Sequence, residues 1–441
     1  MWRILQNRVY GQLFAAQVIA LLGTGLLTVA LGLLAYDLAG ERAGVVLGTA
    51  FAIKMVAYVG LSPIAAALTQ ALPRKAVLIG ADLVRAGVAL LLPFVDGVVQ
   101  IYLLIFVLQA ASATFTPTFQ AIIPDILPDE ADYTRALSLS RLAYDLENLV
   151  SPALAGVLLL LVSFNLLFLG TVLGFMGSAL IVWQVALPRA ATVTVRPFRE
   201  RLTRGIRIYL ATPRLRALLA LNLAVAAAGA FVLVNTIVLV RVGYEGSATD
   251  LTVALAAFGA GSMVAALSLP PMLARLADRA VMLTAAAGLA ALVLGTGAVM
   301  VAGLTVPWVG FLAIWFGIGA LYSAVQTPTG RLLRASTVAE DRPAIFAAQF
   351  ALSHACWLLT YPLAGWAGVA LGLGATMMLL GCVAAVAAGA ARILWITPDG
   401  GPMAHDHPDL SATHPHLAQH SPHHAHVMVI DDLHPRWPHP A

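Results

Sequence analysis

The sequence predicts an all-α membrane protein with twelve transmembrane helices in two pseudo-symmetric six-helix bundles, and with both termini in the cytoplasm. Three observations predict this fold class: the composition, the alternation of long apolar runs with short polar breaks, and an internal repeat. Of the 441 residues, 60% are hydrophobic and only 10% are charged, and the mean hydropathy is +0.89. A soluble domain cannot hide that much apolar surface, so the protein is expected to lie in a bilayer.

Twelve apolar runs are long enough to cross a hydrocarbon core of about 30 Å, which demands about 20 helical residues. Because lipid offers no partner to an open sheet edge, these runs are expected to be helices. The first six runs are 13–36, 44–68, 77–94, 101–122, 137–164 and 166–187. The second six runs are 218–240, 251–273, 281–302, 306–330, 345–371 and 375–394. The first run exceeds the apolar core of a signal peptide, about 7 to 15 residues, and is expected to remain as a helix.

These spans divide the chain into four parts. We expect an N-terminal bundle at 1–187, a basic cytoplasmic linker at 188–217, a C-terminal bundle at 218–395 and a disordered, His-rich cytoplasmic tail at 396–441. Of the 25 Lys and Arg residues, 21 fall on the side of the linker and the termini, which the positive-inside rule makes the cytoplasm. The net charge of +4 thus describes loops beside lipid headgroups and gives no sign of nucleic-acid binding.

The two halves repeat one another. The segment TPTFQAIIPDILPDEADYTRA, from Thr116, aligns with TPTGRLLRASTVAEDRPA, from Thr327, and LPRKAVL at Leu72 aligns with LADRAVML at Leu276. SPALAG at Ser151 answers YPLAG further along the second half. Three matches in the same order predict a parallel duplication of six helices, a plan that transporters often show.

Six plus six helices, a basic central loop and this repeat resemble the major facilitator superfamily, over residues 8 to 395. The family signature between helices 2 and 3 is a loop of the Asp-Arg-Gly-Arg-Lys type. Here the first copy has Gln70 and Ala71 at the usual Asp and Arg, whereas the second copy keeps Asp278 and Arg279. The resemblance makes these two gating candidates, and Asp82 and Arg85, close to the altered first loop, are candidates to replace its salt bridge. Their spacing of three residues near the inner end of the third span favours a structural ion pair for Asp82 and Arg85.

The fifth span reads SLSRLAYDLENLVSPALAG and is similar to drug-efflux members, although Ser151 stands where their antiporter motif has glycine. The stretches AIKMVAYVGLSP and LPDEADYTRALSLSRLAYDLE, together with a His-rich tail, resemble the bacterial nickel and cobalt resistance permeases. No G-x-x-x-x-G-K-[ST] motif occurs, so neither an ATPase nor another enzyme is indicated, and no cofactor is expected. A secondary carrier remains, with lipid, protons and a small cation or small molecule as its partners.

Charged groups at membrane depth are functional candidates because burying them is costly. Glu147 lies about 15 Å along its span and has no opposite charge three or four residues away. It is the main coupling candidate. Asp145 is a second candidate, although Arg141 on the same helical face explains it structurally. Lys54 is a candidate counter-charge, and His354 is a candidate proton carrier or metal ligand, or simply a hydrogen-bonded helix histidine.

Polar amides on spans that line the cavity in this superfamily are weaker candidates for the substrate wall: Gln17, Gln109, Gln326 and Asn235.

Ten of the 11 histidines follow residue 404, in a Pro-rich context. Neutral imidazole suits zinc, copper, nickel and cobalt, and a flexible tail can gather several nitrogens around one ion. The candidate metal ligands are His405, His407, His414, His416, His420, His423, His424 and His426. A solvated low-complexity tail is the plain alternative.

Three functions remain open. The first is a proton-coupled inner-membrane exporter of a divalent metal, with nickel or cobalt implied by the resemblance. The second keeps the fold and exports an organic drug, a siderophore or a metal chelate. The third is a membrane-anchored metal sensor or buffer, against which the repeat and a carboxylate at depth both argue.

Overall fold

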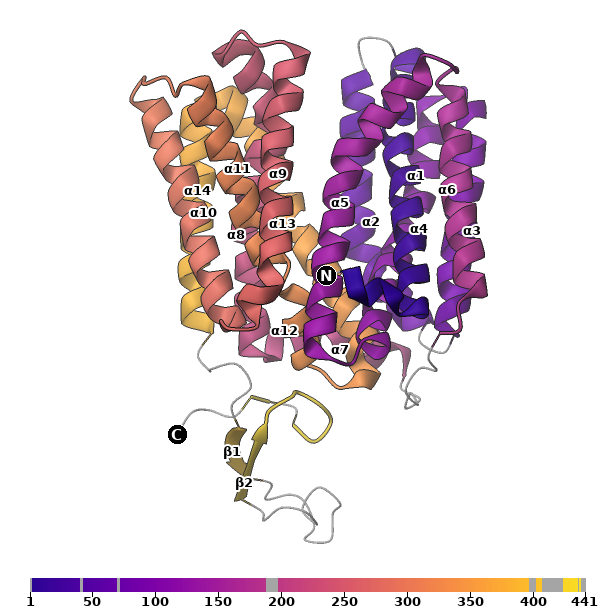
Figure 1. The fold of residues 1–441 in the computed structure, drawn as a ribbon, viewed down its shortest axis with the longest axis vertical. Helices are drawn as coiled ribbons and strands as arrows, with labels where there is room; N and C mark the ends of the chain where they lie inside the picture. Colours follow the sequence, from indigo (N-terminus) through magenta and orange to yellow (C-terminus); the bar gives the residue numbers. More distant parts are fainter. Residues whose placement is uncertain are drawn as a thin grey trace.

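The computed structural model describes residues 2–39, 43–69, 72–187, 197–395, 402–406, 423–434 and 436–437. Two helical bundles stand side by side with their long helices roughly parallel (Figure 1). The N half follows a short 3-10 helix, Trp2–Gln6, and has a second one at Leu92–Phe94. Its six long helices are α1 (Arg8–Ala39), α2 (Ala43–Thr69), α3 (Arg74–Leu91), α4 (Val98–Ile126), α5 (Glu130–Leu159) and α6 (Asn165–Gln184).

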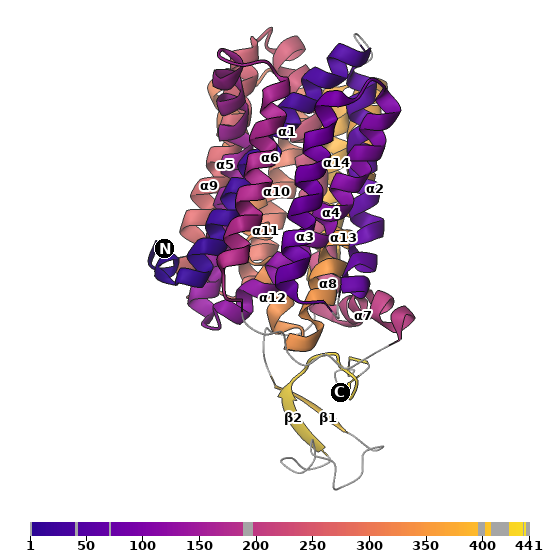
Figure 2. The same ribbon diagram turned by 90° about the vertical axis from the view of Figure 1, so that its right-hand side faces the viewer.

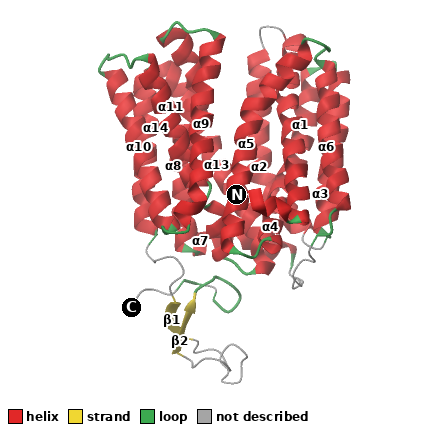
Figure 3. Ribbon diagram, viewed as in Figure 1, coloured by secondary structure: helices red, strands yellow, loops and turns green. Residues whose placement is uncertain are grey.

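The C half repeats this arrangement with six long helices of its own. They are α8 (Pro213–Val238), α9 (Ala248–Leu273), α10 (Asp278–Val301), α11 (Trp308–Gln326), α13 (Arg342–Leu371) and α14 (Leu373–Leu394). A π-helical turn, Leu239–Gly243, extends α8, and a 3-10 turn, Ala339–Asp341, leads into α13. The prediction of twelve long helices in two six-helix bundles is confirmed, and helices dominate the ribbon (Figure 3).

Eleven helices in the described part of the chain are long and apolar enough to cross a membrane. The long helix missing from that set is α5, whose charged residues, Arg141, Asp145 and Glu147 among them, lower its mean hydropathy. It nevertheless packs against α1 and α9 within the bundle. The least apolar long helix is thus the one that carries the coupling candidates.

One end of the bundle holds the connection between the halves, and we call it the linker end. The interval 188–217 contains α7 (Phe198–Ala211), and α12 (Thr329–Ala335) follows α11 at the same end (Figure 2). Along α7, Gly205, Ile208 and Tyr209 are buried while the arginines at its start are more exposed. A side chain at Gly205 would collide with the carbonyl oxygen of Ala344, so only glycine lets α7 approach the backbone of α13.

The halves meet mainly along two helix pairs, α2 with α13 and α5 with α9, and α4 also packs against α13. Within the C half, α9 and α11 approach so closely that a side chain at Gly261 would strike the Phe316 carbonyl, and one at Gly319 would strike the Phe258 carbonyl. Close contact of small residues is how membrane helices gain packing without a hydrophobic driving force. The α2–α13 and α5–α9 pairs place the site described below.

The tail is more ordered than the sequence predicts. Strands β1 (Pro402–Asp406) and β2 (His423–Val427) form an antiparallel hairpin below the linker end, with His405 opposite His424 (Figure 1). Beyond β2, Met428 and Ile430 are buried, and Ile430 joins the hydrophobic core of the C half. The disorder predicted for 396–441 therefore does not hold for the described residues. The apolar run VMVI gives this stretch a face to bury, which the abundance of His and Pro obscures.

Candidate functional site

Three of the predicted charged or titratable residues meet between the two halves. Lys54 on α2 interacts electrostatically with Glu147 on α5 and with His354 on α13. The Lys54 ammonium lies 5.6 Å from the centre of the Tyr58 ring, and Tyr144 senses the charge of Glu147. We call Lys54, Tyr58, Tyr144, Glu147 and His354 the central cluster. All five are half-buried.

Helical spacing brings these side chains together. Lys54 and Tyr58 are four residues apart on α2, and Tyr144 and Glu147 are three apart on α5, so each pair shares a helix face. On α13, Phe350 and His354 are also four apart, with ring centroids 4.2 Å from each other. Tyr58 packs on both rings at 4.7 Å. The charged groups therefore stand beside an aromatic wall that joins α2 to α13.

The contacts of His354 define which ring nitrogen can bind a ligand. Its Nδ1 lies 2.7 Å from the carbonyl oxygen of Phe350. A carbonyl oxygen only accepts hydrogen bonds, so Nδ1 carries the proton and Nε2 carries the lone pair. His354 thus offers one neutral nitrogen base to the space around Lys54 and Tyr58.

Asp145 lies two residues from Glu147 but belongs to a different contact. Arg141 Nη2 donates to Asp145 at 2.9 Å, and Ser262 Oγ on α9 donates to the other carboxylate oxygen at 2.6 Å. Arg141 Nε also donates to Ser262 Oγ at 3.2 Å, and its guanidinium lies over the Tyr322 ring. These bonds join α5 to α9, so Asp145 ties the halves together while Glu147 faces the central cluster.

The four amides predicted to line the substrate cavity have different surroundings. Gln17 is buried and accepts from Ser140 at 3.3 Å. Asn235 is buried and donates to the Ala364 carbonyl at 3.2 Å, which fastens α8 to α13. Gln109 and Gln326 are half-buried, on α4 and at the end of α11.

Asp82 and Arg85 form an ion pair inside the N half, away from the loop whose salt bridge they were candidates to replace. Both side chains are buried, and the Arg85 guanidinium lies 4.3 Å and 4.5 Å from the rings of Phe115 and Phe175. Aromatic rings on α4 and α6 thus enclose the cation. This geometry fits an internal brace of the N half.

The polar bonds at the linker end come instead from residues that the motif search missed. Arg74, at the start of α3, pairs with Asp125 near the end of α4 at 2.6 Å, and Arg342 at the start of α13 pairs with the other oxygen of Asp125. We call Arg74, Asp125 and Arg342 the first network. It joins the altered loop of the N half to the C half.

A second network repeats this pattern from the other half. Arg331 on α12 pairs with Asp278 at 3.2 Å and with Glu130 on α5 at 3.1 Å, and Arg334 pairs with Glu130 at 3.5 Å. We call Glu130, Asp278, Arg331 and Arg334 the second network. Of the two predicted gating residues of the second half, Asp278 thus joins a bond between the halves, and Arg279 follows it at the start of α10.

Further bonds cross between the halves beside these networks. Ser62 on α2 donates to the Ala347 carbonyl at 3.2 Å, and Tyr133 donates to the Gly330 carbonyl at 3.2 Å. With the two networks, these bonds close the linker end in this structure.

The predicted metal ligands of the tail fall into two sets. His407, His414, His416 and His420 lie outside the described residues, and His405, His423, His424 and His426 lie on β1 and β2. Within the described part of the chain, no three residues among His, Cys, Asp and Glu are grouped so as to hold a metal. Metal binding by the tail stays a prediction.

The family model of the Major Facilitator Superfamily matches residues 13–323. The chain belongs to this superfamily. Its sequence is 25% identical over 182 residues to macrolide efflux protein A of Streptococcus pyogenes, which covers 40% of this chain and 44% of that protein. The matched stretch is thus less than half of the relative's length.

Solved structures of facilitator proteins share the fold across nearly the whole chain. The human organic anion transporter MFSD10 (TETRAN) is 12% identical with a TM-score of 0.72, over 87% of this chain and 99% of that one. A bacterial homologue of the iron transporter ferroportin, in its outward-facing state, is 14% identical with a TM-score of 0.72, over 88% and 98%. At these identities the likeness shows the fold alone. The protein is a multi-pass membrane transporter of the facilitator class.

Tyr58, Tyr144 and Phe350 escaped the sequence analysis although each lies three or four residues from a selected residue. That spacing on a helix is the signal that would have found them. Asp125 and Arg342 gave no such local signal, because their partners are distant in the chain.

Proposed function

We propose that this facilitator is a proton-coupled exporter in which Glu147 is the coupling carboxylate and Lys54 its counter-charge. The proposal rests on the arrangement of two half-buried charges. Glu147 on α5 interacts electrostatically with Lys54 on α2, whose ammonium lies 5.6 Å from the centre of the Tyr58 ring, and Tyr58 packs against His354 of the C half. Alternating access in this fold works on a site near the midplane, where such charges are costly and therefore functional by default. We also propose that the linker end is the cytoplasmic end, as its arginines suggest.

The chemistry of coupling follows from competition for one carboxylate. Ionised Glu147 attracts Lys54 and any cationic cargo, and a proton on Glu147 removes that attraction. A proton arriving from outside therefore releases a bound cation, and loss of the proton toward the cytoplasm restores the binding site. Tyr144, on the same helix as Glu147, interacts electrostatically with this carboxylate.

We propose a divalent metal, nickel or cobalt, as the cargo. Glu147 offers oxygen ligands and His354 offers Nε2, a set that first-row metals accept with water completing the shell. The histidines of the tail would gather such ions at the cytoplasmic end, where a tethered chelator raises the local concentration.

An organic cargo is the second candidate, and a specific observation favours it. Tyr58, Phe350 and His354 form an aromatic wall beside Lys54, an arrangement that suits an amphipathic drug, a siderophore or a metal chelate. The described residues hold no group of three metal-ligand side chains, which removes the simplest bare-metal site from that part of the chain. A metal sensor or buffer is the weakest reading for a member of a transporter family.

Flux into inside-out vesicles tests coupling and cargo together. With an imposed proton gradient, wild-type protein should accumulate radioactive nickel or cobalt, and Glu147→Gln should reduce accumulation to background while the purified protein keeps its melting temperature. Asp96→Asn, which alters an exposed carboxylate bonded to Gln100, is the control and should transport normally.

Each other outcome has a meaning. Normal flux by Glu147→Gln would refute the coupling role. Macrolide or dye flux without metal flux would replace the metal proposal by the organic one, and Glu147→Gln would then be tested on that cargo.

A further inference from the structure

The end of the tail is bound to the linker end of the C half. Met428, Ile430 and His434 are 4%, 3% and 5% exposed, and Ile430 belongs to the hydrophobic core that α8 and its neighbours form. Trp437 packs against the same core, 5.9 Å from the guanidinium carbon of Arg214. We call residues 428–434, together with Trp437, the docked segment. Burial of its apolar side chains favours the docked state over a free tail.

A compact turn shapes the docked segment. The Asp431 carboxylate accepts from the backbone N–H of Leu433 at 2.9 Å and of His434 at 2.7 Å, and it pairs with His434 Nδ1 at 2.8 Å. The backbone N–H of Asp431 donates in turn to the carbonyl of His434 at 3.3 Å. This local bonding pre-forms the turn that holds Asp432, so little conformational entropy is lost on docking.

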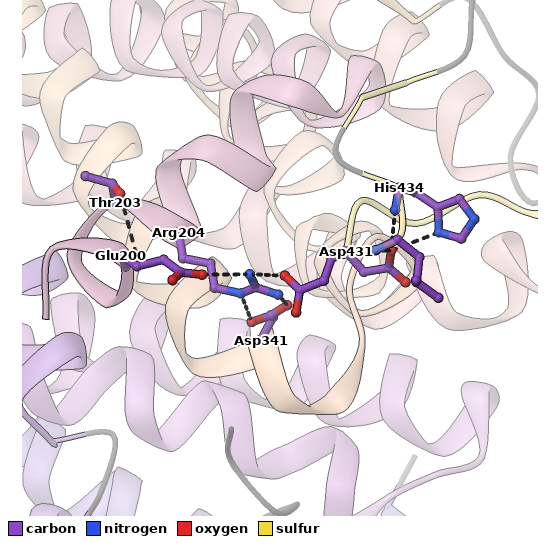
Figure 4. A network of polar contacts seen from close by, with 8 residues as sticks. Glu200, Thr203, Arg204, Asp341, Asp431 and His434 are labelled. Carbon is purple, nitrogen blue, oxygen red and sulfur yellow. Dashed lines mark hydrogen bonds and ion pairs between the residues drawn. The ribbon is translucent and has the colours of Figure 1, made fainter. Parts of the chain in front are cut away.

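Arg204 on α7 receives the docked segment (Figure 4). Its Nη1 donates to Asp432 at 2.8 Å, while Nε and Nη2 donate to the two oxygens of Asp341 at 2.5 Å and 2.7 Å. Glu200, one turn earlier on α7, lies 3.6 Å from the same guanidinium. The Asp341 side chain is 1% exposed and that of Asp432 is 59% exposed. Arg204 therefore has one permanent partner in the C half and one that leaves when the tail leaves.

The place of these bonds connects the docked segment to the contact between the halves. Asp341 directly precedes Arg342, which bonds to Asp125 of the N half in the first network. Helix α7 itself packs against α13 and, in the other half, against α2. A carboxylate of the tail thus acts on the arginine that fixes the first residues of α13, at the position where the two halves are bonded.

We propose that the docked segment is an intramolecular latch, which fastens α7 onto the start of α13 and thereby favours the state in which the linker end is closed. Opening that end requires α2 to part from α13 and the first network to break. With Asp432 in place, Arg204 and Asp341 hold Arg342 where it reaches Asp125. When the segment leaves, the start of α13 gains freedom and opening becomes easier. The latch does not depend on the nature of the cargo.

The test uses the full-length protein in detergent and in vesicles. Hydrogen–deuterium exchange reports whether amides of 428–434 are protected, which shows docking directly. Opening is read from Ser62→Cys, a buried α2 position bonded to α13, by its rate of labelling with an impermeant maleimide in inside-out vesicles. Cys356 and Cys382 are replaced by alanine in this background.

Asp432→Asn should lose part of the protection of 428–434 and raise the labelling rate about two- to fivefold, the range expected of one exposed ion pair. Ile430→Asp should remove the protection and raise the rate more, by about tenfold, because it also forfeits apolar burial. Leu433→Asp changes a 37% exposed residue of the same segment and should alter neither measurement.

Two outcomes would overturn the latch. If 428–434 exchanges at the rate of a free peptide in the unaltered chain, the segment does not dock. If Asp432→Asn and Ile430→Asp release the segment but labelling at position 62 stays at the starting rate, docking does not act on the linker end. Either result leaves the coupling role of Glu147 to be judged separately by flux.

Discussion

The first and second networks both bond the two halves at the linker end, but their central residues carry opposite charges. In the first, Asp125 lies between two arginines, one from its own half and one from the other. In the second, Arg331 lies between two acids, Asp278 of its own half and Glu130 of the other. The alignment of LPRKAVL with LADRAVML puts Arg74 opposite Asp278. One member of each network thus occupies a corresponding position with the opposite charge. The central residues do not correspond, because the alignment from Thr116 and Thr327 places Asp125 opposite Ser336 and Arg331 opposite Gln120.

The networks also differ in exposure. The side chains of Arg74, Asp125 and Arg342 are 12%, 18% and 16% exposed, whereas Glu130 is 53% exposed. A pair that is more buried loses more when one partner is removed, because the remaining charge is left with little solvent. We therefore expect the first network to dominate closure of the linker end.

The largest effect is expected from Asp125→Asn. It leaves two mostly buried arginines facing a neutral amide and should cost the closed state on the order of 2 kcal/mol, between the values for exposed and buried pairs. In the Ser62→Cys background, maleimide labelling should rise and the melting temperature should fall. Asp129→Asn, an exposed acid of the same loop, serves as the control, although it also caps α5. Equal labelling in Asp125→Asn and in the background protein would contradict the dominance of the first network.

The first network shows where sequence reasoning stops. The family signature points to the loop between α2 and α3. Because Gln70 and Ala71 stand at its charged positions, the sequence analysis proposed a nearby acid and base, Asp82 and Arg85, as replacements. Arg74 was already in the loop, but its partner Asp125 is 51 residues away. Only the fold brings them together, because nothing local in the sequence relates Arg74 to Asp125.

Arg331→Gln should have a smaller effect on closure. Glu130 keeps Arg334 as a partner, and Glu130 is exposed enough for water to screen it. We expect a loss of about 1 kcal/mol, half that of Asp125→Asn, measured by the same labelling assay. A loss that exceeds the effect of Asp125→Asn would reverse the ranking of the two networks.

Asp278→Asn should be milder still, because Arg331 retains Glu130 and also donates to Thr134 at 2.9 Å. Although the Arg331 and Asp278 side chains are only 17% and 11% exposed, these remaining partners should limit the cost to roughly a few tenths of a kcal/mol. The variant separates two explanations of the signature Asp in the second loop. If closure depends on that Asp itself, labelling will rise as much as in Arg331→Gln. If closure depends on the bond between the halves, the labelling rate of Asp278→Asn will be close to that of the unaltered protein.

Prediction from the sequence succeeded for features that depend on residues close together in the chain. Apolar length gave the helices, and helical spacing linked Arg141 to Asp145, which are bonded. The charges Lys54, Glu147 and His354 were selected one by one for their depth, and the fold brings them into one cluster. The sequence analysis predicted disorder for the whole tail, because the high His and Pro content of 396–441 obscures its short apolar run VMVI. Its last apolar residues find a partner surface on the C half that exists only after the bundle has formed.

The smallest effect is expected at acid pH. It should concern the first network only, because Arg204 links the docked segment to Asp341, the residue before Arg342. Burial alone would raise the pKa of Asp431, but the hydrogen bonds and charge of His434 outweigh it and hold that pKa below its ordinary value. A carboxylate with a lowered pKa stabilises the docked turn above its unfolded pKa of about 3.9, and this stabilisation is lost as the pH falls through the lower, folded value. Exchange protection of 428–434, corrected for the intrinsic pH dependence, should therefore exceed that of Asp431→Asn between pH 7 and 5. The difference should begin to shrink below about pH 4 and disappear only below the lowered, folded pKa of Asp431, while exchange at Arg331 in the second network stays alike in both proteins. A difference that persisted undiminished to the lowest pH would mean that Asp431 acts through shape and not through its charge.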